Sequence, residues 1–343
     1  MLVAWKIGTD ALSAYSHPNS PKKFTQPQLF AVLALKVLLS LDYRGVEQLL
    51  RDFPGIGEVI GLTTVPDHST LQKAAQRLFR CGRDEKLLHA CIRLMMGRRR
   101  HIRRGAVDSS GLETRHVSSY FVRRRERGPK GAKNPLYQTT TYRRFPKLSL
   151  LCDCATHLIL AARPGRGPRP DQPTFGPLLD RLPHGFTLHS VLGDAGFDSE
   201  ANHVYAREEH GIVSLIPPLI GRPTNKPPSG YYRRQMRRVL GPSQYGQRWQ
   251  SETVFSMTKR NLTCELTTRS YWAQCRELML LAIVHNVMIV LLIEVFDRAY
   301  FSPFLAARRE NAPTPGLPAD FSELSRVAGL TRGAQLPGDF PFT

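Results

Sequence analysis

The order of short apolar runs along this chain is the feature that most constrains its fold. Five runs have the length and residue types of strands, and two helical patterns, 175–181 and 199–209, interrupt the second half of the series. Strands that alternate with helices in this way predict an α/β protein with a mixed sheet and flanking helices. The five predicted strands are 105–107, 148–154, 157–162, 190–193 and 213–216.

Two of these runs end on an aspartate, Asp108 after 105–107 and Asp194 after 190–193. An isolated aspartate at a strand end is most often a turn or cap residue. Asp198 follows closely and stands where a helix from Ser199 needs an N-cap. We therefore interpret Asp194 as the functional carboxylate and Asp198 as structural.

A third candidate carboxylate lies in the segment Tyr245 to Lys259, YGQRWQSETVFSMTK. Tyr245, Arg248, Glu252 and Lys259 stand at offsets that a helix brings within roughly 60° of arc. Such a face suits an enzyme acting on phosphodiesters, because a carboxylate can hold a divalent metal while cations bind phosphate oxygens. A solvated helix face with ion pairs four residues apart explains the same residues without function.

The spacing of these four residues resembles the Y-R-E-K signature of bacterial and archaeal insertion-sequence transposases of the DDE class. The strings around Asp194, G-D-A-G-F-D-S, and around residue 68, V-P-D-H-S-T-L, are also similar to that family. The resemblance covers roughly residues 25 to 295 and implies a ribonuclease H-like fold. Some relatives carry a large β-rich insertion before the glutamate, but 57 residues between Asp194 and Glu252 are too few for it.

The resemblance implies a catalytic triad of Asp108, Asp194 and Glu252 that binds two Mg²⁺ ions, with Mn²⁺ as a substitute. Hard oxygen ligands and phosphate substrates favour these metals. The implied reactions are hydrolysis that exposes a 3′-OH at each element end and attack of that hydroxyl on target DNA. Tyr245, Arg248 and Lys259 would contact DNA phosphates, and a homodimer in a synaptic complex is a further expectation.

The charge of the chain agrees with a nucleic-acid partner. Lys and Arg number 48 against 28 Asp and Glu, a net charge of +20, which favours a polyanionic partner. The resemblance implies that this partner is double-stranded DNA. Two rival classes share this charge: a DNA-binding protein without catalysis, and a ribonuclease H-like nuclease or resolvase without strand transfer. The six cysteines form no C-x-x-C pair, which argues against structural zinc and favours reduced thiols in a cytoplasmic, nucleoid-associated protein.

Three domains are expected. Residues 1–97 form a helical domain that binds DNA ends or simply packs, with Thr25 and Ser69 as helix caps. Residues 98–298 form the catalytic domain, and the basic run 98–104 marks its boundary. That run is either a solvated linker or a functional basic stretch, and two further basic stretches, 122–147 and 219–240, follow. Residues 299–343 form a proline-rich, loosely ordered tail. The apolar helix after Ser270 contains His285 in its middle, and we predict that it is buried against the sheet rather than in a membrane.

Overall fold

The computed structural model describes residues 1–80, 82–97, 99–114, 145–219, 227–241 and 245–296. The chain divides into two compact units, Met1–Leu291 and Leu292–Thr343. The boundary expected between residues 97 and 98 falls inside the first unit and stays a prediction. The basic stretch 122–147 and the proline-rich tail lie almost wholly outside the described residues.

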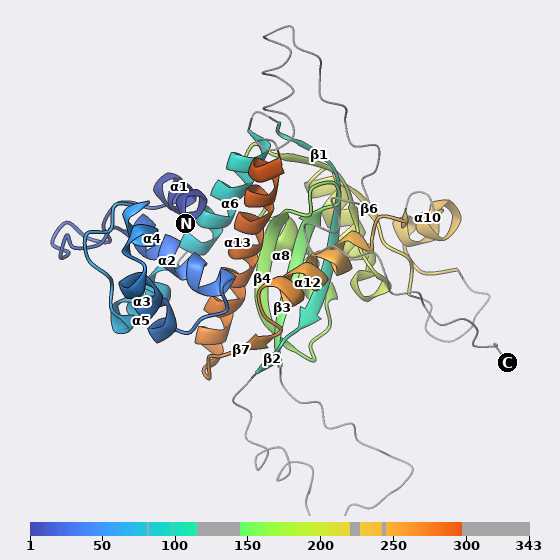
Figure 1. Ribbon diagram of the computed structural model, residues 1–343. Coiled ribbons are helices and arrows are strands. Elements are labelled where there is room, and N and C mark those ends of the chain that lie inside the picture. Colours follow the sequence, from blue (N-terminus) through green and yellow to red (C-terminus); the bar gives the residue numbers. More distant parts are fainter. Residues whose placement is uncertain (81, 98, 115–144, 220–226, 242–244, 297–343) are drawn as a thin grey trace, which may run out of the picture. The chain divides into compact units, whose positions relative to one another are not determined.

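The N-terminal part is helical, as the sequence predicts (Figure 1). Thr25 caps α2 through a complete capping box with Gln28, which confirms the predicted helix start. The predicted cap at Ser69 is wrong. Asp67 is the N-cap of α5, and its carboxylate accepts from the backbone N–H groups of Ser69 and Thr70. The helix begins at His68, so Ser69 already lies within its first turn. The helices of this part are α1 (Leu2–Ala11), α2 (Gln26–Leu38), α3 (Tyr43–Asp52), α4 (Pro54–Glu58), α5 (His68–Leu78) and α6 (Arg83–Met96).

The centre of the first unit is a five-stranded mixed sheet in the order β4-β3-β1-β5-β6. In this sheet, β3 pairs antiparallel with β1 and β4, and β5 and β6 extend the sheet in parallel from β1. All five predicted runs are therefore confirmed as strands. Their bounds are β1 (His101–Gly111), β3 (Phe145–Asp153), β4 (Ile159–Gly167), β5 (Thr187–Leu192) and β6 (Val213–Leu215); β2 (Glu113–Thr114) and β7 (Glu265–Leu266) form a separate parallel pair.

The basic run 98–104 is not a linker where the structure describes it. From His101 onward it belongs to β1, and its residues alternate between the exposed Arg103 and the buried Ile102. The backbone of this run pairs with β5, from His101 opposite Thr187 to Ala106 opposite Leu192. Successive side chains of a strand point to opposite faces of the sheet, so Arg103 lies in solvent while Ile102 is buried. The high charge of the run therefore does not prevent strand formation.

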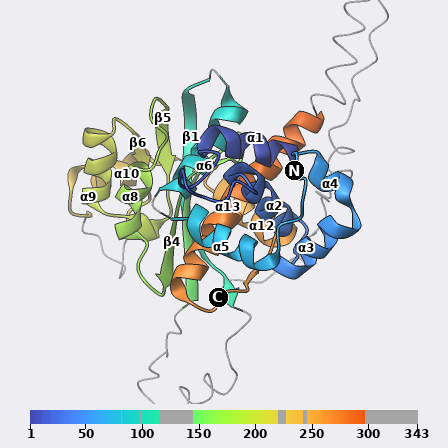
Figure 2. The same cartoon turned by 90° about the vertical axis from the view of Figure 1, so that its left-hand side faces the viewer.

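Helices surround this sheet. The short α8 (Phe175–Leu179) packs on β3 and β4, α12 (Gln250–Asn261) packs on β1 and β3, and α6 contacts β4. In both views the N-terminal helices lie on one side of the first unit, with α6 nearest the sheet (Figures 1 and 2). The remaining helical elements are η1 (Gln172–Thr174), η2 (Ala195–Phe197), α9 (Glu200–Val204), η3 (Tyr205–Glu209), α10 (Tyr231–Val239) and α13 (Tyr271–Phe296).

The long helix α13 is a core helix of the first unit along most of its length. Its segment Tyr271–Ile293 is long and apolar enough to cross a membrane, but 67% of its apolar window is buried inside the protein. His285 and Asn286 are fully buried and satisfied: His285 donates to His157 O, and the Asn286 amide bonds both backbone groups of Ile159 on β4. This pairing confirms the prediction that His285 is a core residue.

Candidate active site

Asp108 and Asp194 occupy equivalent places on two neighbouring parallel strands. The last parallel pair of β1 and β5 is Ala106 opposite Leu192, and each aspartate stands two residues beyond it. The carboxyl ends of parallel strands meet at one edge of a sheet, where ligands bind in open α/β folds. The register therefore brings the two predicted aspartates to the same edge.

Asp108 is half-buried in β1. Its Oδ1 accepts from the Ser109 backbone N–H at 2.7 Å, and its Oδ2 lies 3.3 Å from Ser251 Oγ. Burial raises the pKa of Asp108, and the negative charge of Asp194 raises it further, against the opposing effects of these hydrogen bonds and of Arg248. The two carboxylates are thus close enough to repel each other, which is the setting that a bound cation relieves.

Asp194 follows β5 and caps the short helix η2, accepting from the Gly196 N–H at 3.0 Å. The residue before it, Gly193, is tightly enclosed, since a Cβ there would lie 3.0 Å from Val107 and 3.3 Å from Ile216. A larger residue at this position would have to displace the Val107 and Ile216 side chains. The tight crossing holds the two strand ends together and with them the two aspartates.

Asp198 is structural, as the sequence analysis predicts, but not as a helix cap. Ser199 is the N-cap of α9, and the Asp198 carboxylate is fully buried and bonded to Arg233 of α10 at 2.6 Å. It also accepts from the Leu219 N–H. An aspartate engaged in this way is not free to bind metal, which favours Asp194 over Asp198 as the functional residue.

Glu252 lies in the first turn of α12, and its side chain is 56% exposed. Arg248 donates a hydrogen bond to its carboxylate. Ser251, directly before Glu252, is fully buried. Its hydroxyl donates to Arg248 O at 2.9 Å and lies 3.3 Å from Asp108 Oδ2. Ser251 therefore joins the helix that carries Glu252 to the strand that carries Asp108.

Tyr245 and Lys259 attach the same segment to the sheet edge at both ends. The Tyr245 hydroxyl donates to Gly193 O at 3.1 Å, beside Asp194. The Lys259 ammonium donates to Ser110 Oγ at 2.8 Å, two residues beyond Asp108. Asp108, Asp194, Tyr245 and Lys259 thus lie on or against the carboxyl edge of β1 and β5. Arg248 and Glu252 bond each other, on either side of Ser251, which contacts Asp108.

The expectation that the four signature residues share one helix is wrong in part. Glu252 and Lys259 lie on α12, but this helix begins at Gln250, and Tyr245 and Arg248 precede it. Backbone bonds of the i to i+3 type, from Arg248 to Tyr245 and from Ser251 to Arg248, replace helical ones there. Gly246 contributes, because glycine disfavours a continuous helix.

Sequence reasoning missed three contacts of the site: the hydroxyls of Ser251 and Ser110 and the carbonyl of Gly193. Ser251 directly precedes Glu252 in the sequence, but its burial against the sheet is visible only in the structure. Nothing in the sequence indicated the other two. Among the described residues, no group of three or more His, Cys, Asp or Glu side chains is close enough together to hold a metal ion. The third carboxylate, Glu252, is turned to Arg248.

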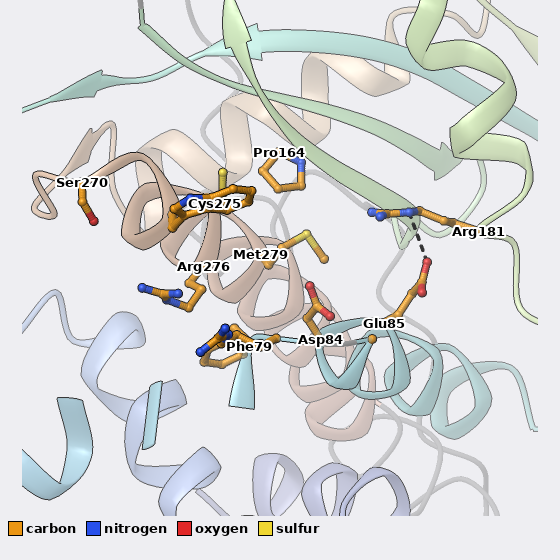
Figure 3. A pocket seen from close by; sticks show the side chains of 12 residues that line it. Phe79, Asp84, Glu85, Pro164, Arg181, Ser270, Cys275, Arg276 and Met279 are labelled. Carbon is orange, nitrogen blue, oxygen red and sulfur yellow. Dashed lines mark ion pairs between the residues drawn. The ribbon is translucent and has the colours of Figure 1, made fainter. Parts of the chain in front are cut away.

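A cavity of about 690 Å³ lies elsewhere, between the start of α6, β4 and the start of α13 (Figure 3). An ion pair between Arg181 and Glu85 crosses it at 3.2 Å, and none of the six predicted residues lines it. None of the predicted carboxylates or cations reaches this cavity. The carboxylate edge is therefore the better candidate for the site.

Comparisons with known proteins identify the family of the chain. The model of the transposase DDE domain family matches residues 99–287, more than half of the chain, and the chain belongs to this family. It is accordingly a DDE transposase, a metal-dependent nuclease and transesterase that catalyses DNA transposition. Among solved structures, a piggyBac transposase synaptic complex with hairpin DNA is similar at 12% identity, over 98% of this chain and 83% of that one, with a TM-score of 0.39. No curated protein matches.

Proposed function

We propose that this transposase mobilises an insertion sequence by cleaving DNA at the element ends and joining the exposed 3′-OH to target DNA, with Asp108, Asp194 and Glu252 as its catalytic carboxylates. The observation that carries the proposal is the shared register of Asp108 and Asp194 beyond the pair Ala106–Leu192. Glu252 joins them because Ser251, its neighbour, contacts Asp108.

The ribonuclease H-like fold is part of this proposal. Its support is the sheet order β4-β3-β1-β5-β6, in which an antiparallel half and a parallel half meet at β1. The junction strand carries Asp108, and its parallel neighbour leads to Asp194. Both aspartates therefore lie on or just beyond the two strands between which the strand order reverses, and ligands bind preferentially at such a point.

Mg²⁺ is the metal we propose, with Mn²⁺ as a substitute. The donors are carboxylate oxygens, which suit hard cations. Burial and, to a smaller extent, the charge of Asp194 raise the pKa of Asp108, and a bound cation would favour its charged form. When bound, two divalent ions supply an activated nucleophile and stabilise the leaving oxygen of an in-line displacement. Asp108 and Asp194 would hold them, and Glu252 would join once Arg248 releases it.

The cations of the site have a second role in this proposal. The guanidinium of Arg248 would exchange Glu252 for a phosphate near the cut, where its planar fork matches two phosphate oxygens. Lys259 would contribute a single positive charge beside Ser110, and Tyr245 would contact the DNA backbone next to Asp194. Double-stranded DNA as the partner, DNA-end binding by the N-terminal helices, a homodimer in the synaptic complex and a cytoplasmic location belong to the same proposal.

The test replaces each carboxylate with alanine. The substrate is the DNA that flanks the coding sequence on either side, incubated with the purified protein and Mg²⁺. Asp108→Ala, Asp194→Ala and Glu252→Ala should each abolish cleavage while DNA affinity stays near that of the wild type. Asp180→Ala is the matched control, since this carboxylate is half-exposed and bonds Tyr205 away from the sheet edge. Full cleavage by any of the three variants would remove that residue from the triad.

A joining assay separates this proposal from the rival enzyme class. A pre-cut end with a free 3′-OH is supplied together with plasmid DNA, and covalent joining is measured. A ribonuclease H-like nuclease or resolvase would cut but not join. A DNA-binding protein without catalysis would do neither.

A further inference from the structure

The helix α10 (Tyr231–Val239) is fixed to the protein by one of its faces. Arg233 donates to the buried Asp198 carboxylate at 2.6 Å, and Met236 is buried. The Arg207 guanidinium lies over the Tyr232 ring, 4.9 Å from its centroid. These contacts come from the segment that follows Asp194, so they set the orientation of α10 relative to the site.

The start of α10 is held by a second acidic side chain. The Glu200 carboxylate accepts from the backbone N–H groups of Tyr232 at 3.0 Å and Arg233 at 3.1 Å. Gly230 makes this possible, because its φ is +98° and a Cβ there would lie 2.1 Å from Glu200 Oε2. Asp198 and Glu200 are thus both occupied on the inner face of the helix.

The outer face of α10 carries a row of exposed basic and aromatic side chains. Tyr231, Arg234 and Arg238 stand at spacings of three and seven residues, so they share one side of the helix. Tyr231 is 70% exposed, and both arginines are exposed. Neither Arg234 nor Arg238 forms an ion pair with any residue that the structure describes.

We propose that this row, Tyr231, Arg234 and Arg238, binds the phosphate backbone of duplex DNA beside the cleavage site. The inference rests on the proposed function. Seven residues of helix span about 10 Å, a length over which a duplex presents about six phosphate charges. Arginines bind such phosphates through their guanidinium groups, and a tyrosine hydroxyl can donate to another.

The position of the row supports DNA rather than another partner. Arg233, on the same helix, is bonded to Asp198, four residues after Asp194. A duplex whose scissile phosphate lies at the carboxylate edge must continue over the neighbouring surface. The exposed charge there is positive on an already basic chain of net charge +20, so a second copy of the chain would be repelled.

The experiment measures duplex binding by fluorescence anisotropy between about 50 and 200 mM salt, with no divalent cation, so that no cleavage occurs. The logarithm of the binding constant falls with the logarithm of salt by about 0.9 for each phosphate contact. The double variant Arg234→Gln/Arg238→Gln should therefore reduce this slope by about 2. The variant Arg234→Lys/Arg238→Lys keeps both charges and should keep the slope.

The matched control removes two arginines at the other end of β1, Arg99→Gln/Arg103→Gln. Both residues are exposed, and the loss of net charge is the same. An unchanged slope in the α10 glutamine variant, or an equal fall in the control, would overturn the inference. If the Arg234→Gln/Arg238→Gln variant without DNA sedimented differently from the wild type and bound DNA equally well, the row would instead be a contact between copies of the chain. Failure of the wild-type protein to bind duplex DNA at all would instead reject the proposed function.

Discussion

The Arg248 guanidinium donates to the Glu252 carboxylate across one turn at the start of α12. The glutamate is 56% exposed and the arginine 25%. An ion pair at the protein surface contributes only about 0.2–1 kcal/mol. The pair is therefore easy to exchange, so that Glu252 can turn to a metal while Arg248 turns to a phosphate.

Replacement of Arg248 tests which role the arginine has. If its planar fork positions the phosphate, Arg248→Lys should lose most of the cleavage rate although it keeps the charge. If Arg248 only neutralises Glu252, the lysine variant should cleave nearly as fast as the wild type. Both variants, Arg248→Lys and Arg248→Ala, are compared in Mg²⁺-dependent cleavage of the flanking DNA at fixed salt. Recovery of most of the rate by lysine would show that the fork geometry is not needed.

A second prediction separates the two aspartates of the 194–198 segment. Asp198→Ala leaves the Arg233 guanidinium without its buried partner and should cost about 3 kcal/mol in the free energy of unfolding. Asp194→Ala removes only the cap of η2 and should cost about 1 kcal/mol, while it abolishes cleavage. Denaturant titration of both variants measures the difference. Equal loss of stability in the two would contradict the assignment of Asp198 as structural.

The sequence predicts the strands and their terminal aspartates well, because alternation of apolar residues and turn residues is local. The partners of those residues are not local. Arg233 lies 35 positions from Asp198, and Ser251 lies 143 positions from Asp108. The start of α12 was also missed, because a regular offset along the sequence does not show where Gly246 interrupts a helix. Tertiary packing decides such contacts, and no pattern within one segment contains that information.

The contact between Ser251 and Asp108 gives a third prediction. The Ser251 hydroxyl favours the charged form of Asp108, so Ser251→Ala should raise the pKa of Asp108 further. Asp108 must be ionised to hold a metal. The pH below which cleavage falls should therefore move upward in this variant.

The pH–rate profile of cleavage measures this shift. Ser256→Ala is the matched control, because it makes the same chemical change elsewhere on α12. A slower Ser251→Ala enzyme with an unmoved acidic limb would show that the serine acts only through packing.

The last prediction concerns acid stability and rests on His285. Burial lowers the pKa of His285 from its ordinary value of 6.5 to about 4, although the hydrogen bond to His157 O opposes the shift. In the unfolded chain the His285 imidazole is protonated below pH 6.5, whereas in the folded protein it is protonated only below about pH 4. The stabilising effect of the neutral imidazole is complete above pH 6.5 and is lost as the pH falls toward 4.

Between pH 7 and pH 5 this one group should lower the free energy of unfolding by about 2 kcal/mol. His285→Gln keeps an amide that can donate to His157 O but cannot titrate, so the variant should lose that part of the acid sensitivity. His203, whose pKa burial also lowers to about 4, leaves a residual dependence in both proteins. Denaturant titration at pH 7 and pH 5 measures the two differences. An equal loss of stability on acidification in the wild type and the variant would show that His285 is not the group that takes up the proton.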